Sequence, residues 1–302
     1  MTTPSDLVSR AIERSVERRR AALQQWRAQR RDDDDVPPTL EVEIRLGVRA
    51  SGNGNRLSPL TCEAPRAGER RWFSSNIGGT HFFGAFEALG ERADEVTPLE
   101  DSVSNHFAAE VAPSSVRCEL PVGTLERAER WTNKHVLERA DYGFPAWFDV
   151  RVALSEEQHI DAPAAVLEAR AIGKRVRNSW NQERTRLGVP KHSRMRHRRS
   201  LRFAAARWWR IDFTEVETSS MVHTDQNSAG HFEHTMRHDE TTLEIEVEYV
   251  GPDDGAPDEA RRQAMLVLSR LAVALGRTPA EVKRRTLEAR QRAEVRQMWT
   301  QM

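Results

Sequence analysis

At 302 residues the chain is long enough for one large domain with appendages or for two small ones. Its 46 acidic and 46 basic side chains cancel, so a preference for a polyanionic partner must come from local segregation of charge. The two cysteines fit neither a metal spacing nor a disulfide framework, and no apolar run reaches the length of a membrane span. These features predict a soluble intracellular protein.

The N-terminal 38 residues predict a helix followed by a linker. Ser5 can cap a helix that runs to about Arg31, with a few apolar residues spread over a basic surface. We interpret it as a solvated or frayed terminal helix rather than as a docking arm. Four aspartates at 32–35 and the Pro37-Pro38 pair then form the linker. We therefore expect a first unit over 1–38 and a main domain over 39–302.

Two segments alternate carboxylates with bulky apolar residues, which is the period of a β-strand. Residues 40–46 carry Glu41 and Glu43 on one face, and residues 243–249 carry three more acidic residues on one face, namely Glu244, Glu246 and Glu248. One such strand alone is most simply a solvated sheet edge. Two that meet in one sheet bring up to five carboxylates together and require a cation or protonation. Oxygen ligands without a Cys/His constellation favour Mg²⁺ or Mn²⁺ over Zn²⁺.

The elements between these two strands are mostly short. The pattern predicts, in order, a loop over 51–71, a short helix with core aromatics over 81–89, strands over 116–120, 129–137 and 148–154, and a basic helix over 162–181. Short strands at close spacing indicate a barrel or a sandwich.

A basic strand and its neighbour follow. Residues 194–202 place Arg194, Arg196 and Arg198 on one face; taken alone this run indicates a nucleic-acid patch or a localisation signal. Residues 209–214 alternate in the same way, with Arg210, Asp212 and Thr214 opposite three apolar residues, as a hairpin partner lining one polar lumen would. Helices over 258–275 and 279–299 are expected on the outside of the domain.

These motifs, in this order, resemble the metal-dependent RNA triphosphatases of mRNA capping, the fungal, protozoan and viral type among the triphosphate tunnel metalloenzymes. The resemblance runs from about residue 40 to residue 250 and includes Thr132-Asn133-Lys134-His135. It implies an all-β dominated fold, a closed eight-stranded antiparallel β-barrel tunnel with peripheral helices. It also implies hydrolysis of the γ-phosphate of 5′-triphosphate RNA to a 5′-diphosphate end, the first step of cap formation.

The resemblance assigns roles to matching residues. Glu41, Glu43 and Glu248 would bind Mg²⁺ or Mn²⁺ directly, with Glu244 and Glu246 in support, and Glu246 and Glu248 among the catalytic groups. The γ-phosphate would be held by Arg151, Arg196 and Arg198. Further substrate contacts would come from Lys134, Arg194, Arg210, Asp212 and Thr214.

Two departures from the family pattern are visible. Arg196 stands where the family commonly has Lys, and Ala153 stands where it has Ser, which puts rate or substrate preference in doubt. One further catalytic glutamate would lie between Glu157 and Glu183 without a clear match. The resemblance implies a nuclear or viral setting and leaves open the docking of an mRNA guanylyltransferase and a homodimer. Other tunnel-fold triphosphatases or polyphosphatases, and a non-catalytic RNA- or polyphosphate-binding module, are the alternatives.

Overall fold

A computed structural model describes residues 3–29, 37–51, 71–92, 94–111, 114–121, 130–144, 148–159, 192–226 and 232–276. The helices are α1 (Pro4–Gln29), α2 (Gly79–Gly90), the 3-10 turn η1 (Ala204–Ala206) and α4 (Pro257–Leu275). The strands are β1 (Thr39–Ser51), β2 (Arg71–Ser74), β3 (Val96–Val111), β4 (Ser114–Pro121), β5 (Arg130–Tyr142), β6 (Asp149–His159), β7 (His192–Phe203), β8 (Trp209–Gln226) and β9 (Phe232–Tyr249). The interior of the predicted loop over 51–71 and the helices predicted over 162–181 and 279–299 lie outside the described residues.

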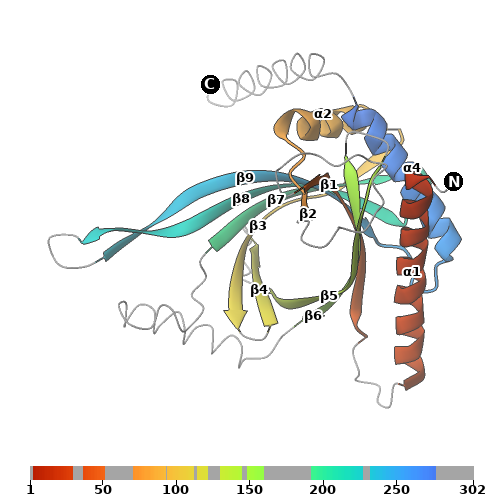
Figure 1. Cartoon of the computed structure of the whole chain (residues 1–302), viewed down its shortest axis with the longest axis horizontal. Helices are drawn as coiled ribbons and strands as arrows, with labels where there is room; N and C mark the ends of the chain where they lie inside the picture. The colour runs from red at the N-terminus through yellow and green to blue at the C-terminus, as the bar shows by residue number, and fades with distance from the viewer. Residues whose placement is uncertain are drawn as a thin grey trace.

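The strands form one antiparallel sheet that curls round on itself (Figure 1). Its order is β2-β1-β6-β5-β4-β3-β7-β8-β9, and β1 also pairs with β9. The order of neighbours therefore returns to β1, through a seam of three residue pairs that includes Glu43 opposite Glu248. The predicted antiparallel, mainly β architecture with a few helices is confirmed. Full closure of the eight-stranded barrel stays a prediction.

Alternation along β1, β8 and β9 gives the curled sheet two different faces. The outer face carries large side chains that are fully buried, such as Ile44 of β1, Phe213 of β8 and Val247 of β9. The inner face carries the charged residues between them. Because the side-chain period of a strand is two, a shift of one residue would exchange the two faces. The register therefore agrees with the faces predicted from the sequence.

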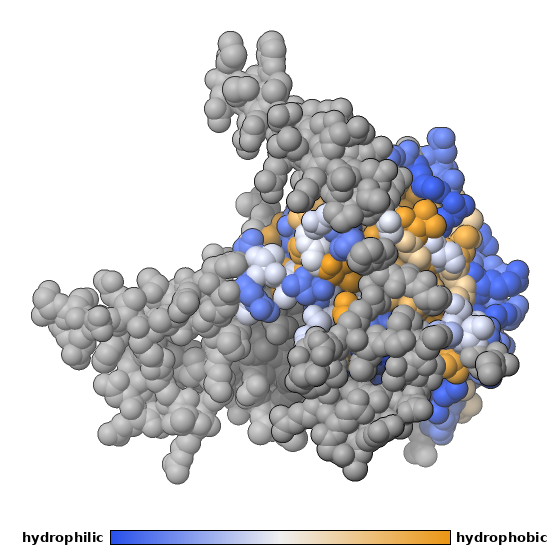
Figure 2. All heavy atoms as spheres, turned by 45° about the horizontal axis from the view of Figure 1, so that its top comes forward, coloured by the Kyte–Doolittle hydropathy of each residue, from blue (hydrophilic) through white to orange (hydrophobic). Residues whose placement is uncertain are grey.

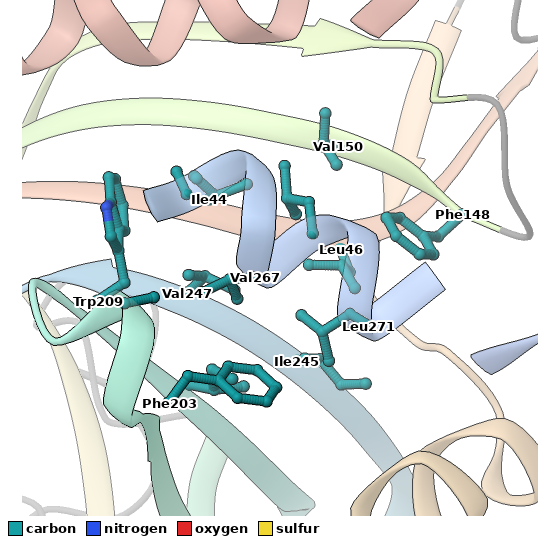
Figure 3. Packing of buried hydrophobic residues seen from close by; sticks show 14 of the residues in the cluster. Ile44, Leu46, Phe148, Val150, Phe203, Trp209, Ile245, Val247, Val267 and Leu271 are labelled. Atoms are coloured by element: carbon teal, nitrogen blue, oxygen red, sulfur yellow. The ribbon is translucent and has the colours of Figure 1, made fainter. Parts of the chain in front are cut away.

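Helix α4 covers the outer face. Val267 and Leu271 of α4 lie against the apolar side chains of β1 and β9, as Figure 3 shows for Ile44, Leu46, Ile245 and Val247. The buried indole of Trp209 donates a hydrogen bond of 2.8 Å to the carbonyl of Ala260, which fixes β8 to the start of α4. This layer keeps the sheet in one register, so the inner-face residues also keep their places.

Helix α1 is not a frayed terminal helix, and that interpretation was wrong. It buries Val8, Ile12 and Val16 in the same core as the strands and α4, and Leu23 is buried further along the helix. Its basic side chains also bind the domain: Arg19 donates to the carbonyl of Leu40 at 2.9 Å and to Asp253 at 2.7 Å, with its guanidinium over the ring of Tyr249. Figure 2 shows hydrophilic residues along the right-hand edge, where α1 and α4 lie, and apolar residues further inward. The boundary at residue 38 remains a prediction.

Two strands were not predicted. β3 pairs with β4 and β7, and β2 pairs with the last four residues of β1. Gly47 of β1 allows β2 to approach closely, because a Cβ there would lie 2.2 Å from the carbonyl oxygen of Ser74 and 2.5 Å from the ring of Phe73. None of the helices in the described part of the chain has the length and apolar composition needed to cross a membrane.

Candidate active site

The candidate site occupies the inner face of the sheet around the β1–β9 seam. Across this seam Glu43 stands opposite Glu248, and Arg45 stands opposite Glu246. On the other side of β9, Arg210 of β8 is paired with Glu248 and Thr214 with Glu244. Three strands thus bring together residues that lie at opposite ends of the chain, and all five predicted glutamates belong to this one surface.

Lys134 of β5 binds the carboxylates of β1. Its Nζ lies 2.7 Å from Oε2 of Glu41, 3.3 Å from Oε2 of Glu43 and 3.6 Å from Oε1 of Glu157. Burial disfavours the ammonium ion, but the charges of Glu43 and Glu41 outweigh this effect and raise the pKa of Lys134. Lys134 is therefore a permanent cation, placed among carboxylates that were predicted to bind metal.

Arg45 is a further residue of this cluster that the sequence did not single out. Its guanidinium lies between two glutamates of the seam, 2.8 Å from Oε1 of Glu43 and in an ion pair with Glu246. Burial again opposes the charged form, while Glu246 and Glu43 raise the pKa of Arg45. The period of two puts Arg45 on the same face of β1 as Glu41 and Glu43. The sequence does not indicate that Glu246 of β9 is its partner.

The end of β9 carries a carboxyl group with an unusual protonation equilibrium. Burial raises the pKa of Glu248 to about 7, against the ion pair with Arg210. The nearby carboxylates of Glu41 and Asp212 act in the same direction as burial. Burial is the largest cause, so the ion pair with Arg210 does not fully offset the cost of burying this carboxylate.

Asp212 is almost completely buried, and hydrogen bonds from Ser200 and Arg210 hold it in place. It accepts one of 2.6 Å from the hydroxyl of Ser200. From Arg210 it accepts contacts of 2.9 Å and 3.0 Å from Nε to its two oxygens and one of 2.8 Å from Nη2. Asp212 thus fixes Arg210, which in turn reaches Glu248. Asp212 therefore lies on the strand between β7 and β9, beside the arginine strand and not on a wall opposite it as predicted.

Of the predicted phosphate-binding arginines of β7, Arg196 reaches the glutamates of β9, whereas Arg198 binds a glutamate of β3. Nη2 of Arg196 lies 3.6 Å from Glu246 and 3.7 Å from Glu244, and Nη2 of Arg198 lies 3.1 Å from both oxygens of Glu100. Glu100 belongs to the unpredicted β3 and was also missed. Arg194 lies on the same strand, opposite Thr218, and its side chain is outside the described residues.

Arg151 stands apart from this cluster. Its register partner on β1 is Arg45, but its guanidinium binds Asp141 at 2.6 Å and 3.0 Å and lies 4.4 Å from the ring centroid of Phe73. Arg151 therefore belongs to the inner face near β2, and the structure does not bring it into contact with Arg196 or Arg198 through any of these interactions.

Oxygen ligands predominate on this surface, which suits a hard divalent cation. In the described residues, however, no group of three or more acidic, histidine or cysteine side chains stands close enough to hold a metal ion. Lys134, Arg45 and Arg210 occupy the positions between the carboxylates instead. The chemistry of the donor set fits Mg²⁺ or Mn²⁺, and binding would require Lys134 or an arginine to give up a carboxylate partner.

No protein-family profile matches the sequence, and no curated protein sequence matches it. Two solved structures of the Pct1 RNA triphosphatase from S. pombe do match the structure. One is 16% identical with a TM-score of 0.52, covering 79% of this chain and 85% of Pct1. The other, with the Spt5 CTD bound, is 15% identical with a TM-score of 0.54, covering 87% of this chain and 94% of Pct1. The chain has the Pct1 fold. The resemblance inferred from the sequence motifs is thereby confirmed as a likeness of fold.

The two residues that depart from the family pattern, Ala153 and Arg196, both lie on strands of the sheet. Ala153 stands directly opposite Glu43 in the β1–β6 pairing, so the inner face has a methyl group there, and the nearest hydroxyl on β6 is that of Ser155, opposite Glu41. Arg196 lies 3.6 Å and 3.7 Å from its two carboxylate partners, beyond the length of a normal hydrogen bond. The segment that would hold the further catalytic glutamate lies outside the described residues, apart from Glu157 itself, which binds Lys134.

Proposed function

We propose that this protein hydrolyses the γ-phosphate of 5′-triphosphate RNA, with a divalent cation, and leaves a 5′-diphosphate end for cap formation. The observation that carries the proposal is the β1–β9 seam, where Glu43 and Glu248 stand opposite each other, with only β8 between β9 and the arginines of β7. A pure polyanion-binding module gains nothing from carboxylates at such density, because they repel the ligand. The Pct1 fold adds support.

The arginines bind and orient the substrate in this proposal. Arg196, at 3.6 Å and 3.7 Å from its carboxylate partners, is weakly held and would exchange them for phosphate oxygens first. Arg198 and Arg210 would follow, each turning from a carboxylate to the triphosphate. Bidentate guanidinium contacts also stabilise charge that develops on the equatorial oxygens in the transition state.

Thr214 offers a further contact. It is completely buried on β8, between the register positions of Arg198 and Glu244, and its hydroxyl has no hydrogen-bond partner within the described structure. A buried hydroxyl without a partner loses its water contacts and gains nothing in return. A phosphoryl oxygen next to Arg198 would restore that hydrogen bond.

The carboxylates complete the site. Glu41, Glu43 and Glu248 would hold Mg²⁺ or Mn²⁺, and Glu244 and Glu246 would orient them. Such an ion, when bound, acts as a Lewis acid on a phosphoryl oxygen. Burial is the main cause of the raised pKa of Glu248, and a cation bound beside it would favour its carboxylate form. The proposal includes a closed eight-stranded tunnel, a nuclear or viral setting, and an mRNA guanylyltransferase or a second copy of the chain as partner.

The test is release of inorganic phosphate from triphosphate-ended RNA with Mg²⁺, with Mn²⁺ and with EDTA. One phosphate per RNA end, a diphosphate product and no release in EDTA are expected. Full activity in EDTA would contradict the metal assignment. Progressive trimming of long polyphosphate with RNA ends left intact would assign the protein to polyphosphate instead. Metal-independent binding without hydrolysis would identify a binding module.

A further inference from the structure

A cavity of about 330 Å³ opens on the inner face beyond the glutamates, and we call it the mouth pocket. Along β9 the order is Glu248, Glu246 and Glu244, and the pocket begins at Glu244 and continues to Thr242 and Glu240. Arg196 forms part of its lining, so the pocket is continuous with the proposed phosphate site. Its volume is at the lower end of the range of small-molecule sites, about 300–1,000 Å³.

One wall of the mouth pocket is held rigidly against β9. The hydroxyl of Ser75 donates a 2.8 Å hydrogen bond to Oε1 of Glu244. The next two residues bind Leu243: the side-chain oxygen of Asn76 accepts from its amide at 3.3 Å, and the amide of Ile77 donates to its carbonyl at 2.9 Å. The wall is therefore formed before any ligand binds, which lowers the entropy cost of binding.

Two aromatic residues of β2 line the same wall. Trp72 is half exposed although it lies in a strand, and Phe73 has the guanidinium of Arg151 over its ring at 4.4 Å. Gly47 makes room for Phe73 and Ser74 against β1. Close packing at Gly47 thus brings β2 against β1 at the edge of a charged site. The hydroxyls of Ser74, Thr218 and Thr242 line the pocket together with Trp72.

We propose that the mouth pocket binds the first nucleoside of the triphosphate-ended substrate, with Trp72 as the surface on which its base stacks. This inference rests on the proposed function, because it takes the phosphates to lie at Arg196. A triphosphate held there must continue into a sugar and a base, and the pocket is the cavity that adjoins Arg196. The hydroxyls named above would meet the ribose.

Stacking explains how such a pocket adds affinity without selecting a base. Every nucleobase has an aromatic face, so an indole stacks on all of them and tolerates any sequence. The half-exposed Trp72 is large enough to cover such a face. The pocket therefore distinguishes a nucleoside triphosphate from inorganic tripolyphosphate, rather than one nucleotide from another.

The test compares binding of ATP, of GTP and of inorganic tripolyphosphate by calorimetry in EDTA, where no metal-dependent hydrolysis occurs. Trp72→Ala should raise the Kd of both nucleotides about tenfold and change the Kd of tripolyphosphate less than twofold. Trp72→Phe is the matched control, which keeps an aromatic face and should restore most of the nucleotide affinity. With triphosphate-ended RNA and Mg²⁺, Trp72→Ala should raise KM and leave kcat unchanged.

Each other outcome has a definite meaning. Equal weakening of nucleotides and tripolyphosphate by Trp72→Ala would overturn the inference, since Trp72 would then only support the fold of the wall. Unchanged affinity for all ligands would overturn it as well. If wild-type protein releases no phosphate from RNA, while Trp72→Ala still weakens binding of nucleotides but not of tripolyphosphate, the proposed function fails and the nucleoside pocket stands.

Discussion

The outer and inner faces of the same strands differ in almost every physical property. On the outer face of β8 and β9, Phe213 and Ile245 are completely buried in the apolar core. On the inner face, one residue away along the chain, Asp212 and Glu246 belong to a network of ion pairs. Apolar burial is the main source of stability in a folded domain, whereas buried ion pairs contribute little net stability. The comparison teaches that stability and chemistry are assigned to alternate residues of one strand.

The largest effect is expected from the outer face. Phe213→Ala removes a ring that packs edge-on against Phe82 and Phe86, with centroids 5.4 Å and 5.3 Å away. The free energy of unfolding should fall by about 3–5 kcal/mol, because a cavity replaces a buried ring. Urea denaturation measures it, and Phe213→Leu should lose much less. A loss below about 1 kcal/mol would show that the core relaxes around the cavity. It would contradict the assignment of stability to the outer face.

On the inner face the expected effect is on rate. Glu43→Gln keeps the shape of the side chain and removes a charge from the carboxylate set. Phosphate release at saturating Mg²⁺ should fall about a hundredfold or more, equivalent to about 2.7 kcal/mol, while the urea midpoint stays close to that of wild type. Asp254→Asn, in the exposed turn before α4, is the charge-matched control and should retain full activity. A variant that loses stability and rate together would contradict a purely chemical role for this face.

Gly47→Ala tests the close packing of β2 on β1. The added methyl group would collide with Ser74 and Phe73, so β2 must move away from β1. We expect the free energy of unfolding to fall by about 1–3 kcal/mol. Relative to wild type, amide exchange should speed up more in β2 than in β8. Gly90→Ala is the matched control, because nothing outside its own helix lies within 4 Å of a Cβ at that position. Equal effects of the two substitutions would mean that β2 is not packed closely on β1.

Alternation made most of the sheet predictable from the sequence. β1, β7, β8 and β9 were identified by residues such as Val42, Ile211 and Val247, which return every second position between charges. β3 was missed because its apolar positions are interrupted by Pro98 and Asp101, so its strand state depends on pairing with β4 and β7. Tertiary pairing of this kind leaves no local signal.

The site was predictable in its members but not in its contacts. The faces of Glu41, Glu43 and the three glutamates of β9 followed from the period of two. That Arg45 would stand opposite Glu246, and that Lys134 would bind Glu41, depends on the register between strands far apart in the chain. Helix α1 was wrongly predicted to be solvated for a related reason. Its arginines bind carboxylate and carbonyl groups of the domain, such as Asp253, and the sequence does not show that these groups lie beside the helix.

The short β1–β9 seam can form only late during protein synthesis, because it joins two strands far apart in the chain. Glu43 leaves the ribosome early and Glu248 late, and the seam between them forms only when β9 has emerged. Until then one edge of β1 has unpaired backbone groups, which invite pairing with other chains. A nascent or truncated chain that stops before β9 therefore lacks Glu244, Glu246 and Glu248 and has an open edge. Strand β9 thus both completes the acidic surface and covers an edge that could pair with other chains.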